Sequence, residues 1–145
     1  MKPSKMRLCS KNRCLWTFEE AQAAVPYFSA VTRSLREHYL EMFAKSRAVQ
    51  KLTERHGRPD RKARIEEQEA CRDLLKAAQD YRDALEELSV LGVQPLHADQ
   101  GIALVPFVHD DQSAWYIFDL FDSQPIRSWC YQSDPEETRR PLTAP

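Results

Sequence analysis

The sequence predicts an α+β protein in which a long antiparallel helical hairpin precedes a small antiparallel β-meander of about three strands. Apolar residues recur every three or four positions from residue 18 to residue 91, which is typical of amphipathic helices. From about residue 93 the pattern changes to short runs rich in aromatic and β-branched residues, which favour strands. The 145 residues have the size of one domain. We expect a single domain over 1–145, divided into a basic tail (1–14), the hairpin (15–92), a β-module (93–131) and a polar tail (132–145).

The first helix has a clear start and an internal interruption. Thr17 and Glu20 have the spacing of a capping box, in which each side chain bonds the other residue's backbone amide. Pro26 lacks an amide hydrogen and crowds the preceding turn, so a kink is expected between Gln22 and Val25. The coiled-coil-like apolar seam reads Phe18, Ala21, Val25, Phe28, Thr32, Leu35, Tyr39, Met42, Ser46 and Val49.

The second helix follows a short break. Gly57 suits a left-handed position at the end of the first helix, Pro59 cannot extend that helix, and Asp60 can cap the next one. Gly92 ends the second helix. Its expected seam, on which Cys71 would be a small buried side chain, reads Cys71, Leu74, Ala78, Tyr81, Leu85 and Leu88, widened by Leu75 and Leu91.

Two helices cannot surround their own apolar seams. Phe43, Leu52, Leu75 and Leu91 need a further covering surface. Either the β-module lies across the hairpin or a second copy completes a four-helix bundle. The second alternative predicts a homodimer.

Three strands are expected after Gly92. They cover residues 102–108, where Pro106 indicates an edge position or a bulge, then 114–121 and 126–131. Residues 109–112 and 122–125 have the composition of turns. The proline-bounded segment after Asp134-Pro135 is expected to be only loosely ordered.

Composition excludes several classes of function. The net charge of −1 gives no overall attraction to nucleic acid or to an anionic membrane, and five basic residues in the first thirteen are too few to predict a nucleic-acid arm. No run approaches the roughly 18 apolar residues of a membrane span, and no apolar region of a secretory signal follows the basic start. Cys9, Cys14, Cys71 and Cys130 lack the spacing of a four-cysteine zinc site. Reduced thiols in the cytoplasm are therefore expected.

Several segments, in this order and spacing, resemble the uncharacterised proteins of domain-of-unknown-function family 2203. They are residues 15–21 with Val25-Pro26, residues 88–93, Gly101-Ile102, then Ile126, Trp129 and 139–142. The resemblance implies a helical hairpin with a β-module and no established activity.

Four positions depart from what is usual in similar proteins. Cys130 stands where a histidine is usual, Tyr131 where an acidic residue is usual, and Phe118-Asp119 where a Cys-Trp pair is usual. If this region binds a metal or a ligand in relatives, that site is lost or changed in this chain.

The candidate binding residues are Trp129, Cys130, Asp119, Arg140 and Trp115. Asp119, Cys130 and His109 are adequate metal ligands, and Cys130 beside His97 or His109 would resemble a nucleophilic pair, but the spacing favours neither arrangement. We predict no catalytic residue, metal or cofactor. The favoured function is a non-enzymatic interaction or scaffold protein that self-associates through its hairpin and offers its aromatic sheet face to a protein partner. The alternative is a small-ligand or metal-binding protein, or an enzyme, with a cleft between hairpin and sheet.

Overall fold

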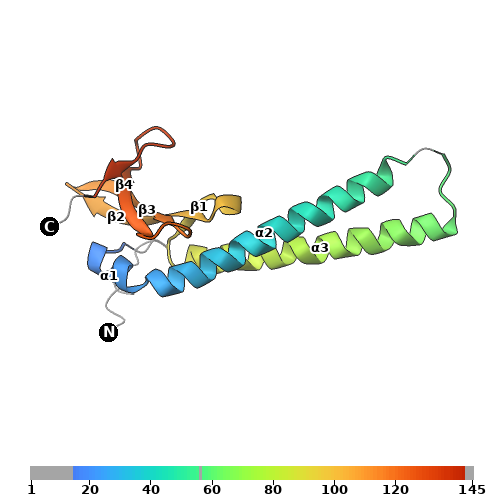
Figure 1. Ribbon diagram of the computed structural model, residues 1–145, viewed down its shortest axis with the longest axis horizontal. Coiled ribbons are helices and arrows are strands. Elements are labelled where there is room, and N and C mark those ends of the chain that lie inside the picture. Colours follow the sequence, from blue (N-terminus) through green and yellow to red (C-terminus); the bar gives the residue numbers. More distant parts are fainter. Residues whose placement is uncertain (1–14, 56, 143–145) are drawn as a thin grey trace.

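A computed structural model describes residues 15–55 and 57–142, and it confirms the α+β fold of a long helical hairpin followed by an antiparallel sheet. The sheet packs against one end of the hairpin, and the other end projects far beyond it (Figure 1). The basic tail with Cys9 and Cys14, together with His56, lies outside the described residues.

The start of the hairpin confirms the capping box and turns the expected kink into a break. The Glu20 amide donates to Thr17 Oγ1, and the Thr17 amide donates to Glu20 Oε1, both at 3.1 Å. Helix α1 (Phe18–Ala23) ends there, and α2 (Val25–Thr53) begins after Ala24. Pro26 falls in the first turn of α2, where its missing amide hydrogen removes no helical bond.

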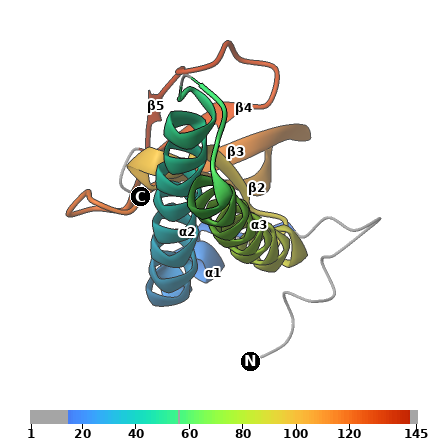
Figure 2. The ribbon, with the colours of Figure 1, turned by 90° about the vertical axis from the view of Figure 1, so that its right-hand side faces the viewer.

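Helix α3 (Arg61–Val90) returns antiparallel beside α2 (Figure 2). The Asp60 carboxylate caps it by accepting from the Ala63 amide at 2.8 Å, as expected. The rings of Tyr39 and Tyr81 meet between the helices with centroids 5.6 Å apart.

The buried stripe of α3 differs from the expected seam at every second position, where the buried residue lies one place earlier in the sequence. Leu74, Tyr81 and Leu88 lie on it, but Cys71 is exposed and is not the buried side chain that was predicted. Alanines at seven-residue intervals bury instead, because alanine fits where two helices come closest. The buried and half-buried seam positions are Ala63, Glu67, Ala70, Leu74, Ala77, Tyr81, Ala84 and Leu88. On α2, likewise, Ser46 is exposed and its neighbour Lys45 is half-buried.

The sheet has five antiparallel strands in the order β1-β2-β3-β4-β5, two more than expected. The strands are β1 (Gln94–His97), β2 (Ile102–His109), β3 (Gln112–Asp119), β4 (Ile126–Tyr131) and β5 (Arg140–Pro141). The added strands are the short edges β1 and β5. The expectation of a loosely ordered segment after Asp134 is therefore wrong as far as Pro141, because Arg140 and Pro141 pair with β4. Asp110 and Asp111 form a two-residue turn with positive φ angles of 50° and 62°.

Pro106 takes an edge position within β2, as predicted. Strand β1 pairs with β2 only as far as Leu104, so β2 has no strand partner on that side at Pro106. The Pro106 carbonyl accepts the Trp16 amide at 3.0 Å instead.

The core lies between the base of the hairpin and the facing side of the sheet. Phe28 of α2 meets Phe118 of β3 with ring centroids 6.0 Å apart, and Trp16 packs on Phe28 at 5.0 Å. The Trp16 indole donates to the Leu91 carbonyl at 3.0 Å, which ties the chain before α1 to the end of α3. Aromatic side chains fill the space between hairpin and sheet at this point. A hollow of about 370 Å³ remains where the end of α3 meets the sheet, and Ser89, Pro106 and Trp115 are among the residues that line it.

Gly101 is a position where a side chain cannot fit. Its φ is +73°, and a Cβ there would lie 2.9 Å from the Leu120 Cβ. We expect Gly101→Ala to lower the free energy of unfolding by about 2–4 kcal/mol, from left-handed backbone strain plus overpacking. Gly57 has φ +92° and open space around it, so Gly57→Ala should cost only about 1 kcal/mol. Equal losses in urea denaturation would show that the contact with Leu120 is unimportant.

The hydroxyl of Thr32 is buried in α2 and has no hydrogen-bond partner within the described part of the chain. Valine has the same shape without the polar atom. We expect Thr32→Val to raise the free energy of unfolding by about 1 kcal/mol, because the buried hydroxyl is not compensated. Exposed Thr53, at the end of the same helix, is the control: its hydroxyl donates to the Gln50 carbonyl at 3.0 Å, so Thr53→Val should lower stability, by less than about 0.5 kcal/mol. A less stable Thr32→Val protein would contradict this account.

Candidate functional site

An aromatic cluster occupies the far end of the helix-facing side of the sheet. Phe107 stacks on Tyr116 with centroids 3.8 Å apart and planes 6° from parallel. Trp129 lies opposite Tyr116 on the neighbouring strand and contacts the rings of His109 at 4.4 Å and Tyr131 at 4.9 Å. Phe107 and Tyr116 are buried, whereas the other three are half-buried. The cluster thus runs from the core to the surface.

Arg140 covers the surface end of this cluster. Its guanidinium lies 5.0 Å from the Tyr131 ring centre and 5.5 Å from that of Trp129. The same group donates two hydrogen bonds of 2.9 Å to the Asp134 carboxylate, which also accepts the Tyr131 amide at 2.9 Å. These bonds, those from Arg140 first, hold the pKa of Asp134 below its usual range. The structure therefore brings together Trp129 and Arg140 of the predicted residues and adds Asp134.

The other predicted residues on β3 and β4 face away from the helices. Trp115 and Cys130 are cross-strand neighbours on this outer face. Residues 132–139, which we call the strap, cross the same face and arch away from the helices (Figure 1). A pocket of about 190 Å³ lies between strap and sheet, and Trp115 and Cys130 line it. Burial raises the pKa of the Cys130 thiol, which favours the neutral, less reactive form.

Asp119 does not join Cys130. Cys130 pairs with Trp115, whereas Asp119 lies four residues further along β3 and pairs with Ile102. Four strand residues span about 13 Å. The Asp119 carboxylate instead accepts the Phe121 amide at 3.1 Å within the following turn.

His109 and His97 contact groups other than the Cys130 thiol. His109 belongs to the aromatic cluster, on the sheet side opposite Cys130. His97 Nε2 lies 2.6 Å from Glu137 Oε2, which fastens the strap to β1. Sequence reasoning named His97 only as a possible partner of Cys130, and it missed Glu137 and Asp134. The only local signal for the last was an aspartate before proline that precedes an Arg-Arg pair.

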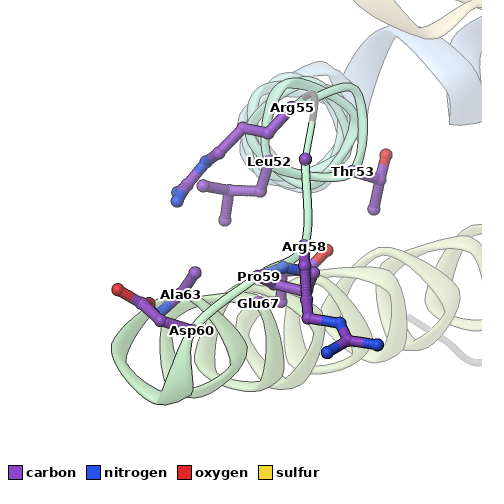
Figure 3. A pocket seen from close by; sticks show the side chains of 9 residues that line it. Leu52, Thr53, Arg55, Arg58, Pro59, Asp60, Ala63 and Glu67 are labelled. Atoms are coloured by element: carbon purple, nitrogen blue, oxygen red, sulfur yellow. The ribbon is translucent and has the colours of Figure 1, made fainter.

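A separate hollow of about 410 Å³ lies at the tip of the hairpin, between the helix ends. Figure 3 shows the side chains of Arg55 and Arg58 pointing to opposite sides of the turn. Because its polar groups diverge, this hollow is the open end of the hairpin and offers no convergent set of ligand-binding groups.

Two further findings concern the described residues only. No three of their His, Cys, Asp and Glu side chains are placed to hold a metal ion. None of their helices combines the length and the apolar character that crossing a membrane requires.

The Asp134–Arg140 pair predicts a pH dependence that one substitution removes. Because its folded-state pKa is lowered, Asp134 stabilises the fold at neutral pH, and this stabilisation is lost as the pH falls through the folded-state pKa. We expect Arg140→Gln to bring the pKa of Asp134 closer to its ordinary value, as measured by NMR titration of the carboxyl carbon. Arg127→Gln is the matched control, because Arg127 pairs with Asp122 at 2.6 Å. It should change the titration of Asp122 and leave that of Asp134 unchanged; an equal shift of Asp134 in both variants would contradict the pairing.

Comparison with known proteins identifies a family and no closer relative. Residues 14–142 match the family model described as uncharacterized conserved protein (DUF2203). Comparisons with curated proteins and with solved structures each gave no match. The matched segment contains the hairpin, the five strands and the strap. The chain therefore belongs to the DUF2203 family of uncharacterized conserved proteins, as its sequence resemblance predicted.

Proposed function

We propose that this protein is a non-enzymatic interaction or scaffold protein that self-associates through its helical hairpin. The observation that carries the proposal is an apolar face of the hairpin that the β-module leaves bare. Leu75 is 68% exposed and Phe43 is 52% exposed, and both are large side chains in the middle of long helices. Exposed apolar clusters of this kind mark interaction surfaces.

Seven-residue spacing identifies this face on both helices, because residues seven apart lie on the same side of a helix. Phe43 follows Arg36 by seven residues, and Arg36 contacts the β-module by donating to the Asp99 carbonyl at 2.8 Å. Cys71 and Ala78 precede Leu85 by fourteen and seven residues, and Leu85 packs against the core. The side that meets the β-module at the base thus continues outward without cover. We call it the bare face; its members are Leu40, Phe43, Cys71 and Leu75.

The distribution of charge along the hairpin favours a second copy of the chain as the partner that covers the bare face. The outer part of the hairpin, residues 43–77, has ten basic and six acidic residues, a net charge of +4. The parts nearer the sheet, residues 25–42 and 78–91, have three basic and six acidic residues, a net charge of −3. Two hairpins that pack antiparallel through their bare faces bring each basic tip toward the acidic base of the other copy. Such a pair forms a four-helix bundle.

The chemistry of the β-module supports a non-enzymatic role. Its carboxylates Asp122 and Asp134 are paired with arginines, and Glu137 is paired with His97. Cys130 is held in its neutral form by burial. We also propose a cytoplasmic location, supported by the free thiols of Cys71 and Cys130. The half-buried aromatic cluster beside Arg140 is the proposed contact surface for a protein partner.

Substitution in the bare face tests self-association. We expect the purified protein to sediment as a dimer at micromolar concentration in analytical ultracentrifugation. Leu75→Glu or Phe43→Glu should raise the dissociation constant roughly tenfold or more, about 1.4 kcal/mol, because a twofold interface contains each substitution twice.

Ala48→Glu is the matched control. Ala48 is exposed on α2 and, at about 100° per residue, lies about 140° around the helix from Phe43. It adds the same charge near the same place along the hairpin and should leave the dimer intact. A wild-type monomer at micromolar concentration, or equal weakening by Ala48→Glu, would refute self-association through this face.

A further inference from the structure

The strap is fastened to the sheet at both of its ends. Near β4, Asp134 accepts the Tyr131 amide and two bonds from Arg140. Near β5, Glu137 reaches across to His97 of β1 at 2.6 Å. The strap thereby spans the outer face from β4 to the opposite edge strand. A loop tied at these points gives the pocket beneath it a defined wall.

Glu137 is held in an unfavourable backbone conformation. Its φ is +76°, in the left-handed region that non-glycine residues rarely adopt. Such strain persists where surrounding contacts enforce it, and it concentrates at functional sites such as ligand clamps. Here Glu137 is the third residue of a turn that the Thr138 amide closes by donating to the Pro135 carbonyl at 3.1 Å, and the side-chain contact with His97 adds a second constraint.

The floor of the pocket is apolar, and the volume of the pocket matches that of one ring system. Leu96, Leu104, Trp115 and Ile117 line it together with the Cys130 thiol. Its volume of about 190 Å³ compares with the roughly 150 Å³ of a dry engineered cavity that binds benzene. A flat or branched apolar body of up to about ten non-hydrogen atoms matches this size.

The wall of the pocket contains charged side chains of both signs, and the positive charge of one of them, Arg139, also helps to lower the pKa of Asp122. Of the acidic wall residues, Asp134 is paired with Arg140 and Glu137 with His97. Arg139 also lines the pocket, and its positive charge acts on the Cys130 thiol on the floor. Glu136 is exposed, so water screens its charge. The pocket thus combines an apolar floor with a guanidinium that can bind a carboxylate.

We propose that the pocket under the strap binds a small monocarboxylate with an aromatic or branched apolar body. The apolar part rests on Trp115 and Ile117, and the carboxylate pairs with Arg139. This site is independent of the bare face of the hairpin, so it stands or falls separately from self-association.

Titration of the full-length protein with sodium benzoate tests the site. We expect saturable binding at millimolar concentration in isothermal titration calorimetry, together with NMR shifts of the Trp115 indole and the Ile117 methyl groups. Benzyl alcohol should bind at least tenfold more weakly, and benzylamine should not bind. Absence of saturable benzoate binding, shifts confined to other residues, or stronger binding of benzylamine would overturn the proposal.

Matched variants separate the carboxylate contact from general charge. Arg139 is exposed, so Arg139→Gln should fold normally and weaken benzoate binding at least tenfold. Arg127→Gln removes an arginine that is paired with Asp122; because it frees a carboxylate that also interacts with Arg139, it should weaken binding less than Arg139→Gln does. Glu136→Gln should leave binding nearly unchanged, because Glu136 is exposed and water screens its charge. Unchanged binding in Arg139→Gln, or equal weakening in both arginine variants, would refute the assigned contact.

Discussion

The hairpin is much longer than the sheet, and this difference in length determines which surfaces of the protein are covered and which are exposed. Helices of 29 and 30 residues are about 45 Å long, whereas the longest strands, of eight residues, span about 27 Å. A sheet of this size can cover only one end of the hairpin. The core therefore forms where Phe28 meets Phe118, and the outer half of the hairpin has only its own seam to bury. The bare face follows from this geometry, since the sheet does not reach it; at Phe43 the Arg47 guanidinium lies 6.0 Å from the ring centre.

Local signals in the sequence predicted the ends of elements better than the contacts between them. The capping box at Thr17, the interruption at Pro26 and the cap at Asp60 depend on residues three or four apart, so the sequence contains all the information they need. The buried stripe of α3 was harder to predict. Ala77 and Ala78 lie on neighbouring stripes with the same period, and only the facing helix decides which one is buried. Strands β1 and β5 were missed because four- and two-residue edges, each with a proline, give no alternation.

The sequence predicted several residues of the candidate site, but it did not predict how they are arranged in space. Trp129 and Arg140 do meet, and Trp115 and Cys130 do share a face. Asp119 was grouped with Cys130 because adjacent strands can bring such residues together. Strand register places the two at different points along β3 and β4, and register depends on turn geometry that a single sequence does not reveal. Pairs such as His97 with Glu137, forty residues apart, are likewise set by topology alone.

Strand alternation also explains what the departures from the family resemblance do. Cys130 and Tyr131 are consecutive, so their side chains point to opposite faces of the sheet. Cys130 lines the pocket under the strap, whereas Tyr131 stacks beneath Arg140 in the aromatic cluster. Residues 130 and 131 therefore belong to two separate surfaces. In the proposed site, Arg139 is the charged group that we expect to pair with a ligand, whereas a histidine at position 130 would add a second titratable cation there. Ligand preference within this family should accordingly follow the residue on the pocket floor, even where the fold and the strap are the same.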